Sequence, residues 1–150
     1  MSARAAQRPG QGVNHRRRLA TRCLVGALAL SGLIPGAYAA VASRGFYDTV
    51  LGVDLLGPYN EHLLTDIGAL YLGFGLLFAW ATVTLGRELA LAACAGWALT
   101  QLLHFTYHAM HLANFTFTQA IEQIAGLAAY LLLVLATAFL VGRLTAKSQE

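Results

Sequence analysis

The sequence predicts an all-α protein, a four-transmembrane-helix antiparallel bundle with both chain ends in the cytoplasm. Only 11% of its 150 residues are charged, against about 25% in an ordinary soluble domain. So few charges cannot cover the surface of a soluble particle, and the mean hydropathy of +0.58 points the same way. The apolar residues fall into four segments, each near the roughly 20 residues that a helix needs to cross a bilayer. Most of the surface of these segments must therefore face lipid.

Residues 1–22 precede the first apolar segment and predict a disordered, cytoplasmic, basic arm. They contain Pro, Gly, Gln and Arg without apolar periodicity, so they cannot offset the entropy cost of ordering. Six of the ten basic residues lie here: Arg4, Arg8, Arg16, Arg17, Arg18 and Arg22. Such a cluster beside a membrane segment signals topology rather than contact with DNA or RNA. We therefore expect membrane lipid as a partner and no nucleic acid.

The transmembrane domain is predicted over residues 23–141, with a cytoplasmic tail at 142–150. Its apolar segments lie near residues 23–42, 61–85, 88–112 and 117–141. Backbone polar groups in lipid must bond internally, so each segment should be a helix. The links at 86–88 and 114–116 are very short, which forces antiparallel neighbours.

The first segment allows a second interpretation. Its basic start, short apolar stretch and Ala-Tyr-Ala at residues 37–39 also match a cleavable secretory signal. The apolar run continues to Ala42, however, which makes it long enough to span. The other three helices keep their orientation in either case.

The longer link at 43–60 predicts a short helix at the membrane interface, ended by Gly57-Pro58. Its apolar residues surround Asp48 and Asp54: Phe46, Tyr47, Val50, Leu51, Val53, Leu55 and Leu56. Small residues four positions apart in the four segments predict close backbone approach between helices. These pairs are Gly32 and Gly36, Ala69 and Gly73, Ala92 and Gly96, and Ala125 and Ala129.

The basic residues predict the orientation. With the amino terminus inside, the arm, Arg87, Arg143 and Lys147 place nine basic residues in the cytoplasm, and only Arg44 lies outside. Cytoplasmic loops of membrane proteins carry such an excess. The sequence thus predicts a multi-pass protein of the cell membrane with the N-in, C-in topology.

Polar side chains are concentrated near the predicted outer ends of three helices. Residues three or four apart share a helix face, which defines one stripe on each segment. The stripes are His62 and Asp66 on the second segment, Trp97, Gln101, His104, His108 and His111 on the third, and Gln119, Glu122 and Gly126 on the fourth. At about 1.5 Å of rise per residue, Asp66 and Glu122 lie roughly 7 Å and His104 about 10 Å inside the outer boundary. We expect the stripes to face inwards and to meet in one layer.

This layer predicts a metal site built from His104, His108 and His111, with Asp66, His62 and Glu122 as further ligands or orienting groups. Imidazole and carboxylate are ligands of zinc, iron and copper, and helix bundles build such sites from inward His and Glu. Such a site could act on a lipid-soluble substrate. The HExxH motif is absent. A haem needs axial histidines on different helices, which only His62 with His104 or His108 provides, so haem is disfavoured.

Three alternatives stay open for the same residues. A hydrogen bond from His104 to Asp66 or Glu122 could fix helix register without chemistry. The protein could equally be a non-catalytic subunit, or a module that binds a small hydrophobic molecule. Proton or ion transfer is the weakest alternative, because the inner halves of the last three helices offer only threonines beyond the layer. Whether the protein is an enzyme, and its oligomeric state, are left open.

The second segment carries a family resemblance. The run Asp66-Ile-Gly-Ala-Leu-Tyr-Leu-Gly-Phe-Gly-Leu76, preceded by Asn60-Glu61-His62, resembles small four-helix bacterial membrane proteins of the DoxX-like and DUF4345-like type. The resemblance covers about residues 45–141. It implies a four-helix bundle, and it implies neither a reaction nor the histidine stripe of the third segment.

Overall fold

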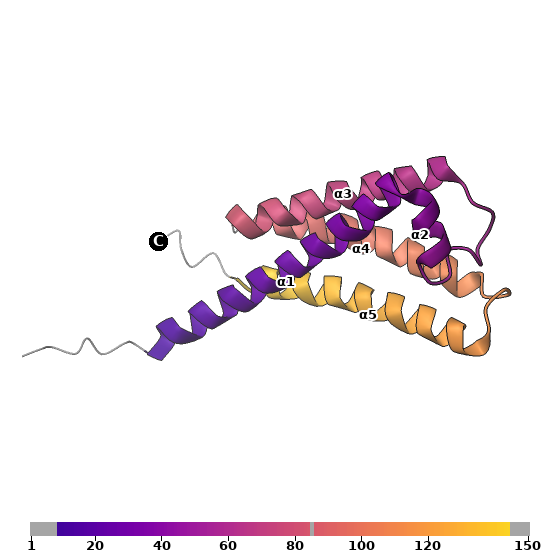
Figure 1. The fold of residues 1–150 in the computed structure, drawn as a ribbon. Coiled ribbons are helices and arrows are strands. Elements are labelled where there is room, and N and C mark those ends of the chain that lie inside the picture. Colours follow the sequence, from indigo (N-terminus) through magenta and orange to yellow (C-terminus); the bar gives the residue numbers. More distant parts are fainter. Residues whose placement is uncertain (1–8, 85, 145–150) are drawn as a thin grey trace, which may run out of the picture.

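Four long helices and one short helix make up the part of the chain that the computed structural model describes, residues 9–84 and 86–144, with side chains from His15 onwards. They are α1 (Pro9–Val41), α2 (Ser43–Thr49), α3 (Glu61–Thr84), α4 (Arg87–Met110) and α5 (Phe117–Gly142), shown in Figure 1. The four long helices are apolar and long enough to cross a membrane. The all-α prediction and the four-helix bundle are confirmed, and the chain is a multi-pass membrane protein. The N-in, C-in orientation stays a prediction.

The first helix begins earlier than predicted. It starts at Pro9, so residues 9–22 of the predicted disordered arm are helical, whereas residues 1–8 lie outside the described chain. Extending an existing helix costs far less than nucleating one, and Arg is a good helix former. The apolar part of α1 therefore propagates back through Arg16, Arg17 and Arg18, whose side chains are exposed. Of the predicted tail, only residues 142–144 are described.

Helices α1 and α3 touch along a seam of glycines. A Cβ added to Gly32 would lie 2.9 Å from the Gly75 Cα, and one added to Gly68 would lie 2.6 Å from the Ala40 nitrogen. Side-chain atoms do not tolerate such distances, so only glycine lets the two backbones come this close. Of the predicted small-residue pairs, Gly32 and Gly36 lie in this seam. By contrast, Gly73 faces open space.

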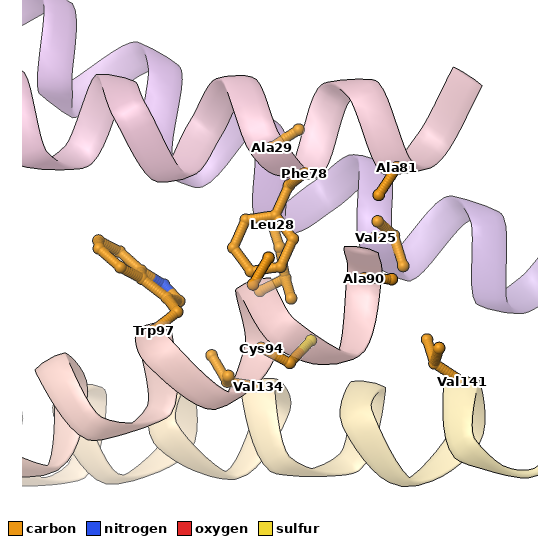
Figure 2. Close-up of a cluster of buried hydrophobic side chains, with 11 residues drawn as sticks. Val25, Leu28, Ala29, Phe78, Ala81, Ala90, Cys94, Trp97, Val134 and Val141 are labelled. Atoms are coloured by element: carbon orange, nitrogen blue, oxygen red, sulfur yellow. The ribbon is translucent and has the colours of Figure 1, made fainter. Parts of the chain in front are cut away.

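The apolar core fills the half of the bundle that contains the turn between α3 and α4, which we call the packed half. Trp97, Phe78, Leu28 and Val134, one from each long helix, are all 0% exposed. Figure 2 shows these side chains between the helices, with Cys94 among them. Because α1 contributes Leu28 to this core, removal of the first segment would leave both the core and the glycine seam open.

A chain of hydrogen bonds lies at the boundary between the packed half and the other half of the bundle. The Trp97 indole N–H donates to the Tyr130 hydroxyl at 3.0 Å, and the Tyr130 and Ser31 hydroxyl oxygens lie 2.6 Å apart. Ser31 gives its own proton to the Leu28 carbonyl, so it must accept from Tyr130. The chain thereby satisfies each of these polar groups and joins α4, α5 and α1.

The opposite half of the bundle is covered by α2 and the turn after it, residues 43–58, which we call the cap. The Tyr47 hydroxyl donates to the Gly57 carbonyl at 2.7 Å, and the Asn114 amide donates to the Leu55 carbonyl at 2.8 Å. The first bond closes the cap on itself. The second ties the cap to the turn between α4 and α5. We call this end of the molecule the capped half.

The cap helix is shorter than predicted, because α2 ends at Thr49 and not at Gly57-Pro58. Gly52 adopts a φ of 81°, which lies in the left-handed region and cannot continue a right-handed helix. A Cβ at Gly52 would also lie 2.8 Å from the Phe115 ring. The helix has already ended before Val50, whose backbone is extended, and the glycine lets the turn that follows approach the link between α4 and α5.

Candidate functional site

The capped half encloses a cavity of about 760 Å³. All four transmembrane helices and the cap contribute to its wall, and most of the lining side chains are apolar or aromatic. Its polar groups come mainly from the last turns of α4 and the first turns of α5. Volumes of roughly 300–1,000 Å³, apolar walls and a few convergent polar groups are typical of sites for small molecules.

The best-defined polar group in the wall is His108, which is 4% exposed. The Gln123 amide nitrogen lies 2.8 Å from the His108 Nδ1. An amide nitrogen only donates, so Nδ1 accepts, and His108 is a neutral imidazole with its proton on Nε2. The ring of His104 packs edge-on against it, with the ring centroids 4.4 Å apart. The two imidazoles and Gln123 thus form one contiguous polar patch on the wall.

Three of the six predicted metal ligands line the cavity: His104, His108 and Glu122. His111 does not, because α4 ends at Met110. Its ring stacks on Tyr107 with the centroids 4.0 Å apart, and its Nδ1 lies 2.7 Å from the Tyr107 carbonyl oxygen.

The other two predicted ligands lie on the outside of α3, so the expectation that all three stripes face inwards is wrong for this helix. His62 Nε2 and Asp66 Oδ2 lie 3.5 Å apart, with side chains 88% and 64% exposed. The opposite side of α3 is the one that packs. It carries a second stripe at alternating four and three spacing, which the sequence also shows: Leu64, Gly68, Tyr71, Gly75 and Phe78. Backbone contact with α1 decides the rotation of the helix.

Fewer of the predicted metal ligands therefore lie near one another than the sequence predicted. In residues 9–84 and 86–144 no group of three or more His, Cys, Asp or Glu side chains lies close enough to hold a metal ion. His62 does not reach the cavity wall that His104 and His108 share, so the axial pair considered for haem is not brought together. Binding of zinc, iron or copper stays a prediction.

Other residues of the site had a different role or were missed. Gln119 does not face the cavity but closes a capping box at the start of α5, where its side chain accepts from the Thr116 N–H at 2.9 Å. The Thr-x-x-Gln spacing is the signal for this role. Gln123, one turn after Gln119, takes the inward position. The cap residues Phe46 and Tyr47, predicted to lie in the membrane interface, form part of the cavity wall.

The described charged side chains near the site include no basic group that is free to face the cavity. Among the residues that the structure describes, no Lys or Arg side chain lines the cavity. Arg44, the cap's only basic residue, is paired with Asp48 at 3.0 Å and lies over the Tyr59 ring. The Asp48 carboxylate raises the pKa of Arg44, which fixes its charge but directs it along the cap.

The cavity reaches the lipid-facing surface between α1 and α5. These helices approach at Ser31 and Tyr130, and Figure 1 shows that α1 then runs away from α5 towards α3. Beyond this point exposed residues of both helices line the cavity, Ile34 and Tyr38 on α1 and Glu122 and Gly126 on α5. A Cβ added to Gly126 would meet nothing within 4 Å. The cavity is therefore open sideways.

The comparisons with known proteins found no match to this chain. No protein-family model matches the chain, and no curated protein and no solved structure matches it either. The resemblance to DoxX-like and DUF4345-like proteins accordingly stays a prediction.

Proposed function

We propose that this protein binds a small, largely apolar molecule that is dissolved in the membrane, and that it does so without catalysing a reaction. The observation that carries this proposal is the cavity of about 760 Å³ in the capped half. Its size and its wall, mostly apolar with a few polar groups in one patch, match small-molecule sites.

The polar patch supports a binding role over a purely structural one. Placing His104 and His108 in the hydrocarbon layer has a cost, because polar and ionisable groups there are disfavoured. A network that only held the helices together would use both imidazoles against neighbouring helices. Among described residues, however, only His108 makes a side-chain hydrogen bond, to Gln123, which leaves its Nε2 proton for a ligand.

The opening between α1 and α5 supports entry from the lipid. If the basic residues orient the chain as predicted, the capped half lies in the outer leaflet of the cell membrane. A lipid-soluble molecule could then pass between Ile34 and Gly126 without crossing the aqueous phase. The predicted metal function would have to use His104, His108 and Glu122 in the same wall, and nothing in their arrangement favours it over an organic ligand.

The test uses N-phenyl-1-naphthylamine, a neutral apolar fluorescent probe, with protein in lipid nanodiscs. Wild-type protein should show saturable fluorescence above that of empty nanodiscs. Gly126→Phe should abolish this signal, because the new ring enters the opening of the cavity. Gly73→Phe is the matched control, since Gly73 also faces open space but lies on α3 away from the cavity.

Two results would contradict the proposal. One is the absence of saturable binding by the wild type, and the other is equal binding by the Gly126→Phe and Gly73→Phe variants. Elemental analysis of the same preparations checks the metal alternative. Near-stoichiometric zinc, iron or copper that is lost in His108→Ala would favour that alternative.

A further inference from the structure

Glu122 is the one carboxylate among the described residues that form the cavity wall. It makes no ion pair with any residue at 9–84 or 86–144, where the only pairs are Arg44 with Asp48, His62 with Asp66, and Arg87 with Glu88. Nor does it make a side-chain hydrogen bond in that part of the chain. Glu122 is exposed where the cavity opens, and a carboxylate inside a membrane is disfavoured without a partner, so a bound cation would stabilise it.

The groups around Glu122 do not supply that cation. Within residues 9–84 and 86–144, no Lys or Arg lines the cavity. His108 accepts a hydrogen bond at Nδ1 and is therefore neutral. Arg44 is engaged by Asp48 on the cap. The described part of the wall thus carries one carboxylate and no basic side chain, so an anionic ligand such as a fatty acid would find no cation there and would be repelled by Glu122.

Aromatic side chains complete the recognition. Among the described residues, five Phe or Tyr rings line the cavity, from α1, the cap, α3 and α4: Tyr38, Phe46, Tyr47, Tyr71 and Tyr107. The hydroxyls of Tyr47 and Tyr38 are already hydrogen-bonded, to the Gly57 carbonyl and to Thr49. Aromatic rings attract organic cations, most strongly where water is excluded.

We propose that the ligand is a lipophilic cation, an organic ammonium or phosphonium ion with apolar substituents. This inference rests on the proposed function and names its ligand class. The positive centre lies at Glu122, beside the opening between α1 and α5, and the apolar substituents extend inwards to Tyr71. Entry from the lipid and charge recognition then occur at the same place.

The test compares three probes on the full chain in dodecyl maltoside, with equilibrium dialysis as the measurement. Tetraphenylphosphonium and tetraphenylborate have nearly the same size and shape but opposite charge, and N-phenyl-1-naphthylamine is neutral. Wild-type protein should bind tetraphenylphosphonium at least about tenfold more tightly than tetraphenylborate. This comparison needs no variant, so it does not depend on the folding of one.

A pair of variants then assigns the charge. Glu122→Gln should weaken tetraphenylphosphonium binding by at least about tenfold. Asp66→Asn is the matched control, because Asp66 is predicted at a similar depth but lies on the outside of α3 and should leave binding unchanged. Gel filtration confirms that both variants are folded.

The outcomes separate the two proposals. If the wild type binds the neutral probe but binds the two tetraphenyl ions equally, the cation inference is overturned and the proposed cavity function stands. Equal losses in Glu122→Gln and Asp66→Asn also overturn it, because the effect would then be a general one of surface charge. If no probe binds saturably, both proposals fail.

Discussion

In the packed half of the bundle, side chains from all four transmembrane helices fill the space between the helices, whereas in the capped half the same helices enclose a cavity. The change occurs at Ser31 and Tyr130, the point beyond which α1 turns away from α5. On one side of this point lie Phe78 and Leu28, and on the other lie His104 and His108. The difference shows that side-chain packing between the helices varies along the bundle. Substitutions in the packed half should therefore change stability, and substitutions in the capped half should change binding.

The largest expected effect comes from the same substitution made in each half. Phe78→Ala should lower the free energy of unfolding by about 3–5 kcal/mol, because Phe78 is 0% exposed and its removal leaves a void. Phe46→Ala in the cavity wall should cost less than about 1 kcal/mol, because its ring already borders open space. Unfolding by sodium dodecyl sulfate in mixed micelles gives both values. Equal losses would show that the two halves do not differ in packing.

A smaller loss in the free energy of unfolding is expected from a substitution at the boundary between the packed half and the capped half. Tyr130→Phe leaves the buried Trp97 N–H without its acceptor, which should cost about 1–3 kcal/mol in the same unfolding measurement. Tyr107→Phe makes the identical change on a tyrosine whose hydroxyl forms no hydrogen bond with a described residue, and it should be neutral. A neutral Tyr130→Phe would mean that the Trp97–Tyr130–Ser31 chain does not hold the helices together.

The sequence was sufficient for the fold but only partly for the site, and α3 shows why. Hydropathy and length determine which segments are helices in lipid, since backbone hydrogen bonds can be satisfied in no other way there. They do not determine the rotation of a helix, because lipid tails are as apolar as a protein core. On α3 a polar stripe with His62 and Asp66 competes with a glycine stripe on the opposite side. The polar stripe lies in the first turns of the helix and reaches the surface.

The positions of the α4 histidines were easier to predict than those of the α3 polar residues. The spacing placed His104 and His108 on one face with Trp97 and Gln101, and the structure buries Trp97, Gln101 and His108 on that face. His111 has the same spacing but follows the last residue of the helix. The cavity itself could not be predicted, because it depends on the path of α1 and on a cap whose turn is set by Gly52.

The smallest expected effect concerns the bond that ties the cap to the rest of the capped half. Asn114→Ala removes the 2.8 Å hydrogen bond to the Leu55 carbonyl. Both groups are at the surface and can bond to water instead, so the free energy of unfolding should fall by no more than about 0.5–1 kcal/mol. Local opening of the cap should nevertheless become more frequent, because exposed segments with few contacts open independently of the core.

Hydrogen–deuterium exchange distinguishes these two effects. Peptides that cover residues 50–58 should exchange faster in Asn114→Ala than in the wild type, while peptides from the packed half, around Phe78 and Cys94, stay unchanged. Thr118→Ala is the control, since it lies near the same turn and its hydroxyl makes no hydrogen bond in the part of the chain described. Faster exchange in both halves would show that the cap and the core unfold as one unit. In that case the two halves would differ in packing but not in stability.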